Sequence, residues 1–120
     1  MFSVHESKVT AIELPGRRWF YLVGPDNCGA KGICFGLAEF PAKTTASSHV
    51  HAAEEEVIFV LSGRGKLLGP GGEAELVPGT AAYVPPGEDH QVISEGDEPL
   101  KIVTLFCPPV RPGSYDRASR

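Results

Sequence analysis

Short segments of apolar or alternating residues, each ended by glycine or proline, are the feature that most restricts how this chain can fold. Alternation with a period of two is typical of strands, and the 3.6-residue period of helices is scarce here. The 14 glycines and 11 prolines in 120 residues lie well above average usage. Many turns between many short strands predict an all-β sandwich or closed barrel.

About nine strands are predicted, and local chemistry explains the turns between them. Gly69–Gly72 reads as a hairpin loop, Pro78-Gly79 fits a type II turn, and Pro85–Gly87 ends a strand because proline cannot donate to a ladder. The expected strands are Trp19–Val23, Ile33–Phe40, Ala46–His51, Val57–Leu61, Gly65–Leu68, Ala74–Val77, Ala81–Val84, His90–Ser94 and Leu100–Cys107. We expect a single domain over residues 1–120: an N-terminal arm or edge strand, a core barrel over about 19–107, and an extended tail over 108–120.

Composition excludes several classes of protein. Apolar residues make up 42% of the chain, enough for a core, yet no apolar run approaches the length of a membrane span. The net charge is −4 without a basic stripe, which argues against nucleic acid and anionic membranes. The start of the chain does not look like a secretory signal. The three cysteines form no CxxC pair, so we expect free thiols and a cytoplasmic, reducing compartment.

Three of the four histidines have a spacing that suits metal binding. On a strand, His49 and His51 would point to the same face, about 6–7 Å apart along the backbone. Glu56 follows five residues later, and His90 opens another strand. If these strands are neighbours, three imidazole nitrogens and one carboxylate converge, a set that suits Fe, Mn, Ni, Cu or Zn. The fourth, His5, is expected to be a bystander.

Two spaced motifs carry a resemblance to a known family. The first is His49-x-His51-(four residues)-Glu56-(six residues)-Gly63, and the second is Gly79-(five residues)-Pro85-x-Gly87-(two residues)-His90. They resemble the two motifs of the cupin superfamily, in its small single-domain form. The resemblance implies a jelly-roll barrel, or double-stranded β-helix, which holds one divalent transition metal. It favours Fe or Mn, with Zn, Ni or Cu as alternatives.

Two positions depart from the family pattern. Lys43 stands where the family has a glycine, and Ser94 stands where it has an asparagine. Neither position holds metal in the family, so the resemblance still implies His49, His51, Glu56 and His90 as the metal ligands. The departure at Lys43 leaves the conformation of the local turn open.

Three consecutive glutamates precede the strand Val57–Leu61, and we assign the ligand to Glu56. It lies seven residues before Gly63 and shares parity with Ile58 and Val60, whereas Glu55 would face the other way. Glu56 is also the candidate catalytic base. Apolar walls would raise the pKa of its carboxyl group and a metal would lower it, and the residues alone do not decide which effect is larger.

A pocket beside the metal is expected to be lined by strand residues. The candidates are Ile58, Val60, Tyr83, Val92 and Phe106. Cys107 ends the last strand and could reach the barrel mouth. Arg17 and Arg18 read as a solvated pair, with binding of a carboxylate as the alternative. Whether any of these three residues reaches the pocket is left open.

The leading hypothesis is a small metal-dependent enzyme acting on an oxygen-rich or enolisable small molecule. The resemblance implies a dioxygenase first and a lyase or isomerase second, because an open metal can bind dioxygen or act as a Lewis acid. The alternative is a binding or sensing module without turnover. A storage-type structural barrel is a weaker third reading. A homodimer is also expected, since a small barrel leaves a sheet edge or face exposed.

Overall fold

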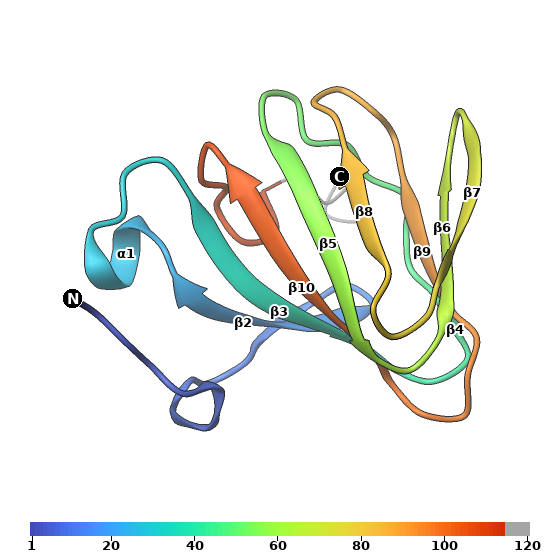
Figure 1. The fold of residues 1–120 in the computed structure, drawn as a ribbon, viewed down its shortest axis with the longest axis horizontal. Helices are drawn as coiled ribbons and strands as arrows, with labels where there is room; N and C mark the ends of the chain where they lie inside the picture. The colour runs from blue at the N-terminus through green and yellow to red at the C-terminus, as the bar shows by residue number, and fades with distance from the viewer. Residues whose placement is uncertain (115–120) are drawn as a thin grey trace.

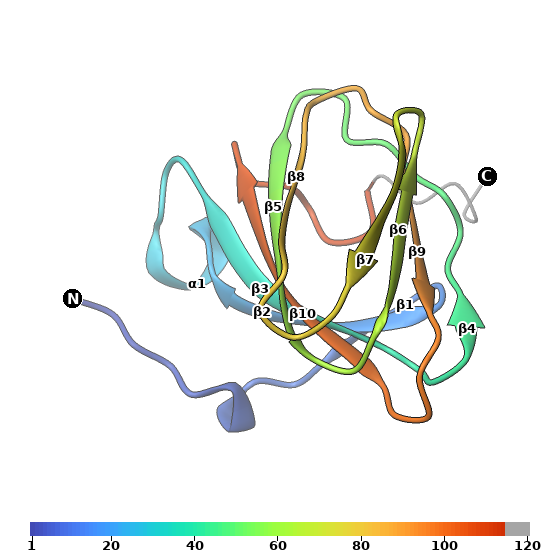
Figure 2. The same ribbon diagram turned by 45° about the vertical axis from the view of Figure 1, so that its right-hand side comes forward.

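The computed structural model describes residues 1–114 and confirms the all-β class (Figure 1). The elements are a 3₁₀ helix at Glu6–Lys8, β1 Ile12–Leu14, β2 Arg17–Val23, α1 Pro25–Cys28, β3 Cys34–Phe40, β4 Thr44–Thr45, β5 Glu55–Ser62, β6 Gly65–Gly69, β7 Gly72–Leu76, β8 Ala81–Val84, β9 Gln91–Ser94 and β10 Leu100–Cys107. One antiparallel sheet has the order β1-β2-β3-β10-β5-β8, and the other has β4-β9-β6-β7. The two sheets face each other around a shared interior (Figure 2).

The core lies between the inner faces of the two sheets. Its largest buried side chains include Phe106, Ile58 and Ile102 from the six-stranded sheet and Leu76 from the four-stranded sheet. Each is at most 2% exposed, so burying one contributes about 1.5–3 kcal/mol relative to leaving it in water. The short alternating segments therefore form strands because one face of each can join this core.

Strand β5 shows the alternation most clearly, with inward and outward residues taking turns over its length. Ile58 and Val60 face inward and are 1% exposed, whereas Val57, Phe59 and Leu61 face outward and are about 40% exposed. Both faces of the strand are therefore apolar, although only one is covered by the described part of the chain.

Two glycines allow backbone approaches that no other residue permits. A Cβ on Gly36 would lie 2.4 Å from the Trp19 ring, so the indole packs directly on the β3 backbone. Gly63, at the turn after β5, has a φ of 80°, and a Cβ there would lie 2.4 Å from the Pro99 carbonyl oxygen. The glycine that ends the first motif is thus required by the backbone.

The turn containing Lys43 is now defined. Lys43 has a φ of 55°, which makes it the one non-glycine residue with positive φ in the described range 1–114. This left-handed conformation is the one that glycine adopts without cost. The family's glycine at this position is thereby explained, and Lys43 takes the same conformation with its side chain paired to Asp97 at 3.0 Å.

The prediction of a strand over Ala46–His51 is wrong. The regular ladder ends at Thr45, and the next paired residues are Ala46, whose N–H donates to Val92, and His49, which bridges His90. From Ala46 to His49 the segment advances by three residues, whereas the partner segment advances by only two, from Val92 to His90. One extra residue puts the ladder out of step, as in a β-bulge, so His49 and His51 stand on irregular backbone.

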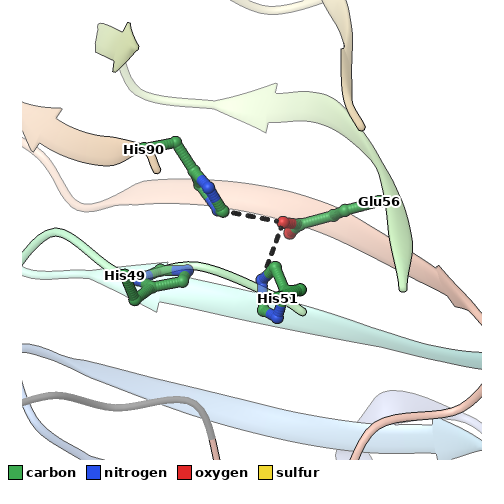
Figure 3. Close-up of side chains that lie close together, drawn as sticks. All are labelled: His49, His51, Glu56 and His90. Carbon is green, nitrogen blue, oxygen red and sulfur yellow. Dashed lines mark ion pairs between the residues drawn. The ribbon is translucent and has the colours of Figure 1, made fainter. Parts of the chain in front are cut away.

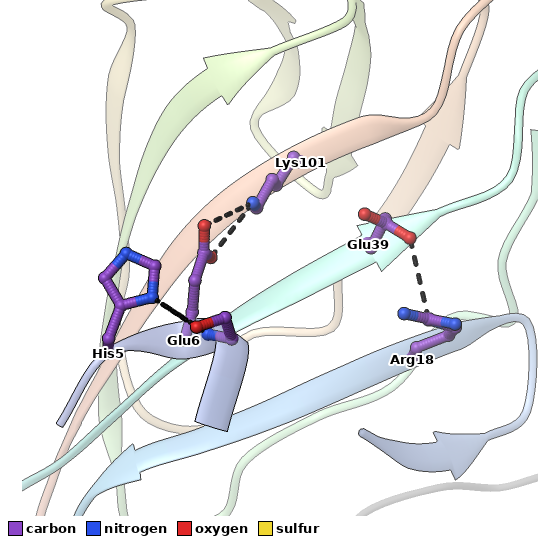
Figure 4. Close-up of polar contacts among 6 residues, drawn as sticks. His5, Glu6, Arg18, Glu39 and Lys101 are labelled. Carbon is purple, nitrogen blue, oxygen red and sulfur yellow. Dashed lines mark hydrogen bonds and ion pairs between the residues drawn. The ribbon is translucent and has the colours of Figure 1, made fainter. Parts of the chain in front are cut away.

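The two ends of the chain pack differently from the barrel. At the N-terminal arm, Lys101 on β10 pairs with Glu6 at 3.0 Å, and the His5 ring caps the 3₁₀ helix through Ser7 (Figure 4). The arm and β1 agree with the predicted arm or edge strand. Val110 of the predicted tail is 9% exposed and packs on the core, while the rest of that prediction, 115–120, lies outside the described residues. No helix within 1–114 is long and apolar enough to cross a bilayer.

Candidate metal centre

The structure brings the four predicted residues His49, His51, Glu56 and His90 together inside the barrel (Figure 3). One possible ligand atom from each lies within 4.8 Å of all the others. Glu56 Oε1 is 3.2 Å from Nε2 of His51 and 3.2 Å from Nε2 of His90. The side chains of these three are at most 5% exposed, and His49 is half-buried.

Different kinds of backbone position the four side chains. Glu56 is the second residue of β5, paired with Phe106 on one side and Val84 on the other. His49 and His90 exchange backbone hydrogen bonds of 2.9 Å, which places their rings side by side with centroids 4.3 Å apart. The carbonyl of His51 accepts from the N–H of Gly87. The two cupin-like motifs therefore meet through backbone hydrogen bonds.

The carboxyl group of Glu56 is ionised at neutral pH. Burial acts to raise its pKa, but the imidazoles of His51 and His90 outweigh burial and bring the pKa down to about 2. Burial likewise opposes the charged form of His90, yet Glu56 beside it raises the pKa of that imidazole above its ordinary value. From the sequence alone, apolar walls and a bound metal ion act on this pKa in opposite directions; the structure adds His51 and His90, which by themselves outweigh burial.

His49 is held in its neutral form. Burial, and then the proximity of His90 and His51, lower the pKa of His49 to about 3. A neutral imidazole has a lone pair available for a metal ion, whereas a protonated ring does not.

The ring of His90 is oriented by a neighbouring carbonyl. Its Nδ1 lies 3.0 Å from the Glu88 carbonyl oxygen, which can only accept, so Nδ1 carries a proton and donates it. This bond leaves Nε2 directed at the cluster, the arrangement in which metal-binding histidines are usually held. The Phe106 ring packs edge-on against His51, with centroids 4.9 Å apart.

The cluster passes a test of fit for a metal ion. Among the described residues, Glu56 Oε1 and His90 Nε2 are buried polar atoms without an aligned hydrogen bond, although they contact each other. Such atoms are costly to bury unless a cation or a proton satisfies them. Three nitrogens and one oxygen suit a divalent first-row metal, and a bound ion would occupy the place between these atoms.

A small cavity of about 20 Å³ adjoins the cluster, room for about one water molecule. Its described lining residues are Arg17, Trp19, Ala38, Phe40, His49, Glu56, Ile58, His90, Val92, Ile102, Thr104 and Phe106. Of the predicted pocket residues, Ile58, Val92 and Phe106 therefore lie on this cavity. Val60 is buried in the core but is not among the described lining residues.

Tyr83 does not face the interior, so its predicted place in this pocket is corrected. It pairs with Val57 across β5 and β8, shares its outward direction and is 57% exposed. Its hydroxyl donates to Glu55 at 2.8 Å, and it is among the lining residues of a second pocket, which β8 shares with β6, β7 and His90. Glu55 therefore lies on the outer face, and Glu56 alone of the two joins the cluster.

The sequence left open whether Arg17, Arg18 or Cys107 reaches the pocket, and of these three Arg17 lines the cavity. Arg17 is 8% exposed and lines it, while Arg18 is partly exposed and pairs with Glu39. Cys107 is exposed and is not among the described lining residues. Parity with Trp19, a residue typical of a core, is the sequence signal that would have placed Arg17 inside.

Comparison with known proteins gives relatives of several activities. An uncharacterised protein of Methanocaldococcus jannaschii is 33% identical over 81 residues, which are 66% of this chain and 65% of that protein. A glucose-6-phosphate isomerase of Thermococcus litoralis is 40% identical over 68 residues, 52% of this chain but only 36% of the isomerase. The chain thus covers less than two thirds of both relatives.

Solved structures match over most of the chain. The polyketide cyclase RemF from Streptomyces resistomycificus has a TM-score of 0.77 and 26% identity, covering 93% of this chain and 82% of the cyclase. A predicted oxalate decarboxylase from Thermotoga maritima has a TM-score of 0.78 at 18% identity, covering 90% and 99%; at that identity the match shows the fold alone. The family model that matches residues 36–106 is the cupin domain. This match contains both motifs and covers more than half of the chain, so the chain belongs to the cupin family.

Proposed function

We propose that this cupin is a small metal-dependent enzyme acting on an oxygen-rich or enolisable small molecule. The observation that carries the proposal is the convergence of three imidazoles and an ionised carboxylate on one buried point next to a cavity. Structural zinc sites are usually closed and rich in cysteine, whereas this set contains none. A divalent metal there would supply Lewis-acid polarisation of a carbonyl or stabilisation of an enolate.

The residues of the chain have separate roles in this proposal. His49, His51 and His90 would hold the ion through ring nitrogens, and the Glu88 carbonyl fixes the ring of His90. Glu56 serves first as an anionic ligand, because a carboxyl group with a pKa of about 2 is a weak base. The apolar wall of Ile58, Val92 and Phe106 keeps bulk water away from the reacting group.

The comparisons favour isomerase, lyase or cyclase chemistry over dioxygenase chemistry. The matched relatives with stated activities include archaeal isomerases and a cyclase that is 26% identical. The Lewis-acid reading needs one ion and no oxidant. The dioxygenase reading, favoured with Fe or Mn by the resemblance, remains testable because oxygen consumption separates the two.

Metal analysis of protein purified without a chelating tag is the first test. We expect about one divalent ion per chain, and His51→Ala should remove most of it. Turnover is then sought with sugar phosphates, 2-oxo acids, diketones and catechols, with an oxygen electrode in parallel. Full metal loading without turnover of any of these would contradict the enzyme and favour the sensing module. Absence of metal from the wild-type protein would contradict the site itself.

We further propose that the protein is a homodimer built on the outer face of β5 and β8. Val57, Phe59, Leu61 and Tyr83 on this face are 39–57% exposed, and β10 extends it with Val103 and Leu105, the cross-strand partners of Phe59 and Val57. A contiguous apolar face of this kind is usually covered by a partner. Light scattering should give twice the chain mass, and Phe59→Lys should return it to one; a wild-type monomer would contradict the dimer.

The location of the protein in the cytoplasm also stays a proposal. Cys28, Cys34 and Cys107 are free thiols in the structure, a state that a reducing compartment maintains. Fractionation of the host cell would test it, and recovery of the protein outside the cytoplasm would contradict it.

A further inference from the structure

The barrel is not closed by backbone pairing between β7 and β8. β8 ends the six-stranded sheet and β7 ends the four-stranded sheet, and in the described sheets the two strands are not neighbours (Figure 1). They follow each other in the chain through the turn 77–80, in which the N–H of Thr80 donates to the Val77 carbonyl at 2.9 Å. We call the space between these two edge strands the seam. Edge strands present backbone donors and acceptors that a bound molecule can use.

A pocket of about 340 Å³ lies in the seam. Residues of β6, β7 and β8 line it, together with Glu88 and His90. Its volume is within the range that is usual for small-molecule sites, whereas the cavity of about 20 Å³ beside the cluster holds about one water molecule. The seam pocket, unlike that cavity, therefore has room for the body of a substrate.

Two alanines on the edge strands shape this pocket. Ala74 on β7 is the cross-strand partner of Leu67, and Ala82 on β8 is the cross-strand partner of Ile58. Because Leu67 and Ile58 are buried, both alanines point to the inner side of their sheets, away from the outer face proposed for the dimer. Ala74 is nevertheless exposed, so the seam opens this side to solvent. Side chains this small leave a slot that suits a flat ring.

His90 connects the pocket to the proposed metal site. It lines both the seam pocket and the small cavity, and no other described residue lines both. The carbonyl of Glu88 orients the His90 ring, and the carboxylate of Glu88 lies over Gly69, where an added Cβ would be 3.4 Å from Oε2. A molecule bound in the seam therefore lies next to a proposed metal ligand and close to a carboxylate.

The charges around the pocket disfavour anions. Its described acidic residues are Glu73 and Glu88, and no lysine or arginine is among the described residues that line it. Lys66 pairs with Glu73 at 3.4 Å, which compensates one of the two carboxylates. The carboxylate of Glu88 can accept a hydrogen bond from a hydroxyl group, but it repels a second negative charge.

We propose that the seam pocket binds an uncharged, flat ring compound that carries a hydroxyl group. The hydroxyl donates to the Glu88 carboxylate, and the ring lies against Ala74 and Ala82. The inference rests on the proposed function, because it names the class of substrate for the same metal site. Phenols and catechols fit this class, whereas sugar phosphates and 2-oxo acids carry an anionic group. A phenol is favoured over a free sugar because its ring carbons are apolar, and burial against apolar side chains stabilises them.

Calorimetric titration with 2-naphthol tests the inference, with 2-naphthoate and glucose as the comparison ligands. 2-Naphthol is uncharged at neutral pH, as phenols are, and 2-naphthoate has the same two rings with an anionic group. We expect 2-naphthol to bind wild type at least about tenfold more tightly than 2-naphthoate. Equal or tighter binding of 2-naphthoate would overturn the selection against anions. Tighter binding of glucose would overturn the choice of an apolar ring.

Two substitutions at neighbouring positions of β7 locate the bound molecule. Ala74→Phe fills the slot with a bulky ring and should weaken 2-naphthol binding about tenfold or more. Glu75→Phe adds the same ring on the opposite face of the strand, where Glu75 is the partner of Lys66, and should leave the affinity within about twofold. Melting curves and metal content show that the fold and the cluster persist in both variants. Unchanged affinity in Ala74→Phe would overturn the assignment of the seam.

Glu88→Gln tests the charge without adding bulk, and it keeps the proposal testable if Ala74→Phe fails to fold. Removing the carboxylate should reduce the preference for 2-naphthol over 2-naphthoate about threefold or more, because the like-charge repulsion is lost. Glu75→Gln removes a carboxylate from the outer face and should leave the preference unchanged. The same preference in Glu88→Gln as in wild type would overturn the role of Glu88.

Titrations of metal-loaded and chelator-treated protein separate this inference from the proposed function. Binding of 2-naphthol that Ala74→Phe abolishes, in a protein that takes up no metal, would contradict the proposed function alone. Full metal loading without binding of 2-naphthol, or with binding indifferent to Ala74→Phe, would contradict this inference alone.

Discussion

The inner and outer faces of the six-stranded sheet carry the same residue types in opposite surroundings. Glu56 lies inside the metal cluster, and its neighbour Glu55 lies outside on the Tyr83 hydroxyl. Arg17 is inside and Arg18 outside, as described above. Cys34 is buried on the inner face of β3, and Cys107 is exposed at the end of β10. Chemical identity alone therefore does not set the role of a side chain here; the parity of the strand does.

The largest expected effect is on metal content, through the pair of glutamates. Glu56→Gln removes the anionic ligand from a buried site and should lower bound metal at least about tenfold, since a neutral amide oxygen is a poorer ligand. Glu55→Gln should leave metal content unchanged. Elemental analysis of both proteins checks this. Loss of metal in the Glu55 variant instead would break the distinction between the faces.

Thiol reactivity should differ by orders of magnitude between the two faces. Cys34 is 0% exposed, so a reagent cannot reach its sulfur. Burial also raises the pKa of this thiol, so little of it is in the reactive thiolate form. In a Cys28→Ser background, we expect Ellman's reagent at pH 8 to label Cys107 at once and Cys34 only after unfolding. Rapid labelling of two thiols in the folded protein would show that the inner face opens.

Stability should separate Ile58 from Val57, its neighbour on β5. Ile58→Ala empties part of the core and should lower the free energy of unfolding by about 2–5 kcal/mol. Val57→Ala on the outer face should lower it by less than about 1 kcal/mol. Urea unfolding at several protein concentrations measures both. An effect of Val57→Ala that shrinks on dilution would mark the outer face as an interface, because the contribution of a dimer contact is lost when the dimer dissociates. Equal effects of the two substitutions would contradict the comparison.

The smallest effect is expected for the outer ion pair. Arg18 and Glu39 are partly exposed and 3.6 Å apart, so Arg18→Gln should change the free energy of unfolding by less than about 1 kcal/mol. Thermal melts in low and high salt check this value. A larger loss that salt does not reduce would mean that packing of Arg18 on Phe20 matters more than its charge.

The period of two explains what the sequence could predict. It placed Glu56 on the same face as Ile58 and Val60, because successive side chains of a strand point to opposite faces while the register holds. Tyr83 is the cross-strand partner of Val57 and faces outward with it, a pairing that the sequence alone does not reveal. Arg17 was left open although Trp19 two residues later shares its face.

Backbone irregularities explain what the sequence did not reveal. The extra residue between Ala46 and His49 has no signature in a single chain, because the hydrogen bonds that replace the ladder come from residues some 40 positions away. Helix α1 is one turn, stabilised locally by the Asn27 side chain accepting from the Gly24 N–H. The left-handed conformation of Lys43 likewise could not be predicted from the residue type, because lysine seldom adopts a positive φ.

The backbone pairing of His49 with His90 has a consequence for the lifetime of the protein. An ion held by both would join positions 41 residues apart (90 minus 49), enclosing β5 to β8, and would act as a reversible cross-link. In the chain-entropy description of cross-links, a loop of that length is worth about 4 kcal/mol. Metal supply would then govern how much of the protein survives proteolysis, so that abundance, as well as activity, follows the availability of the ion.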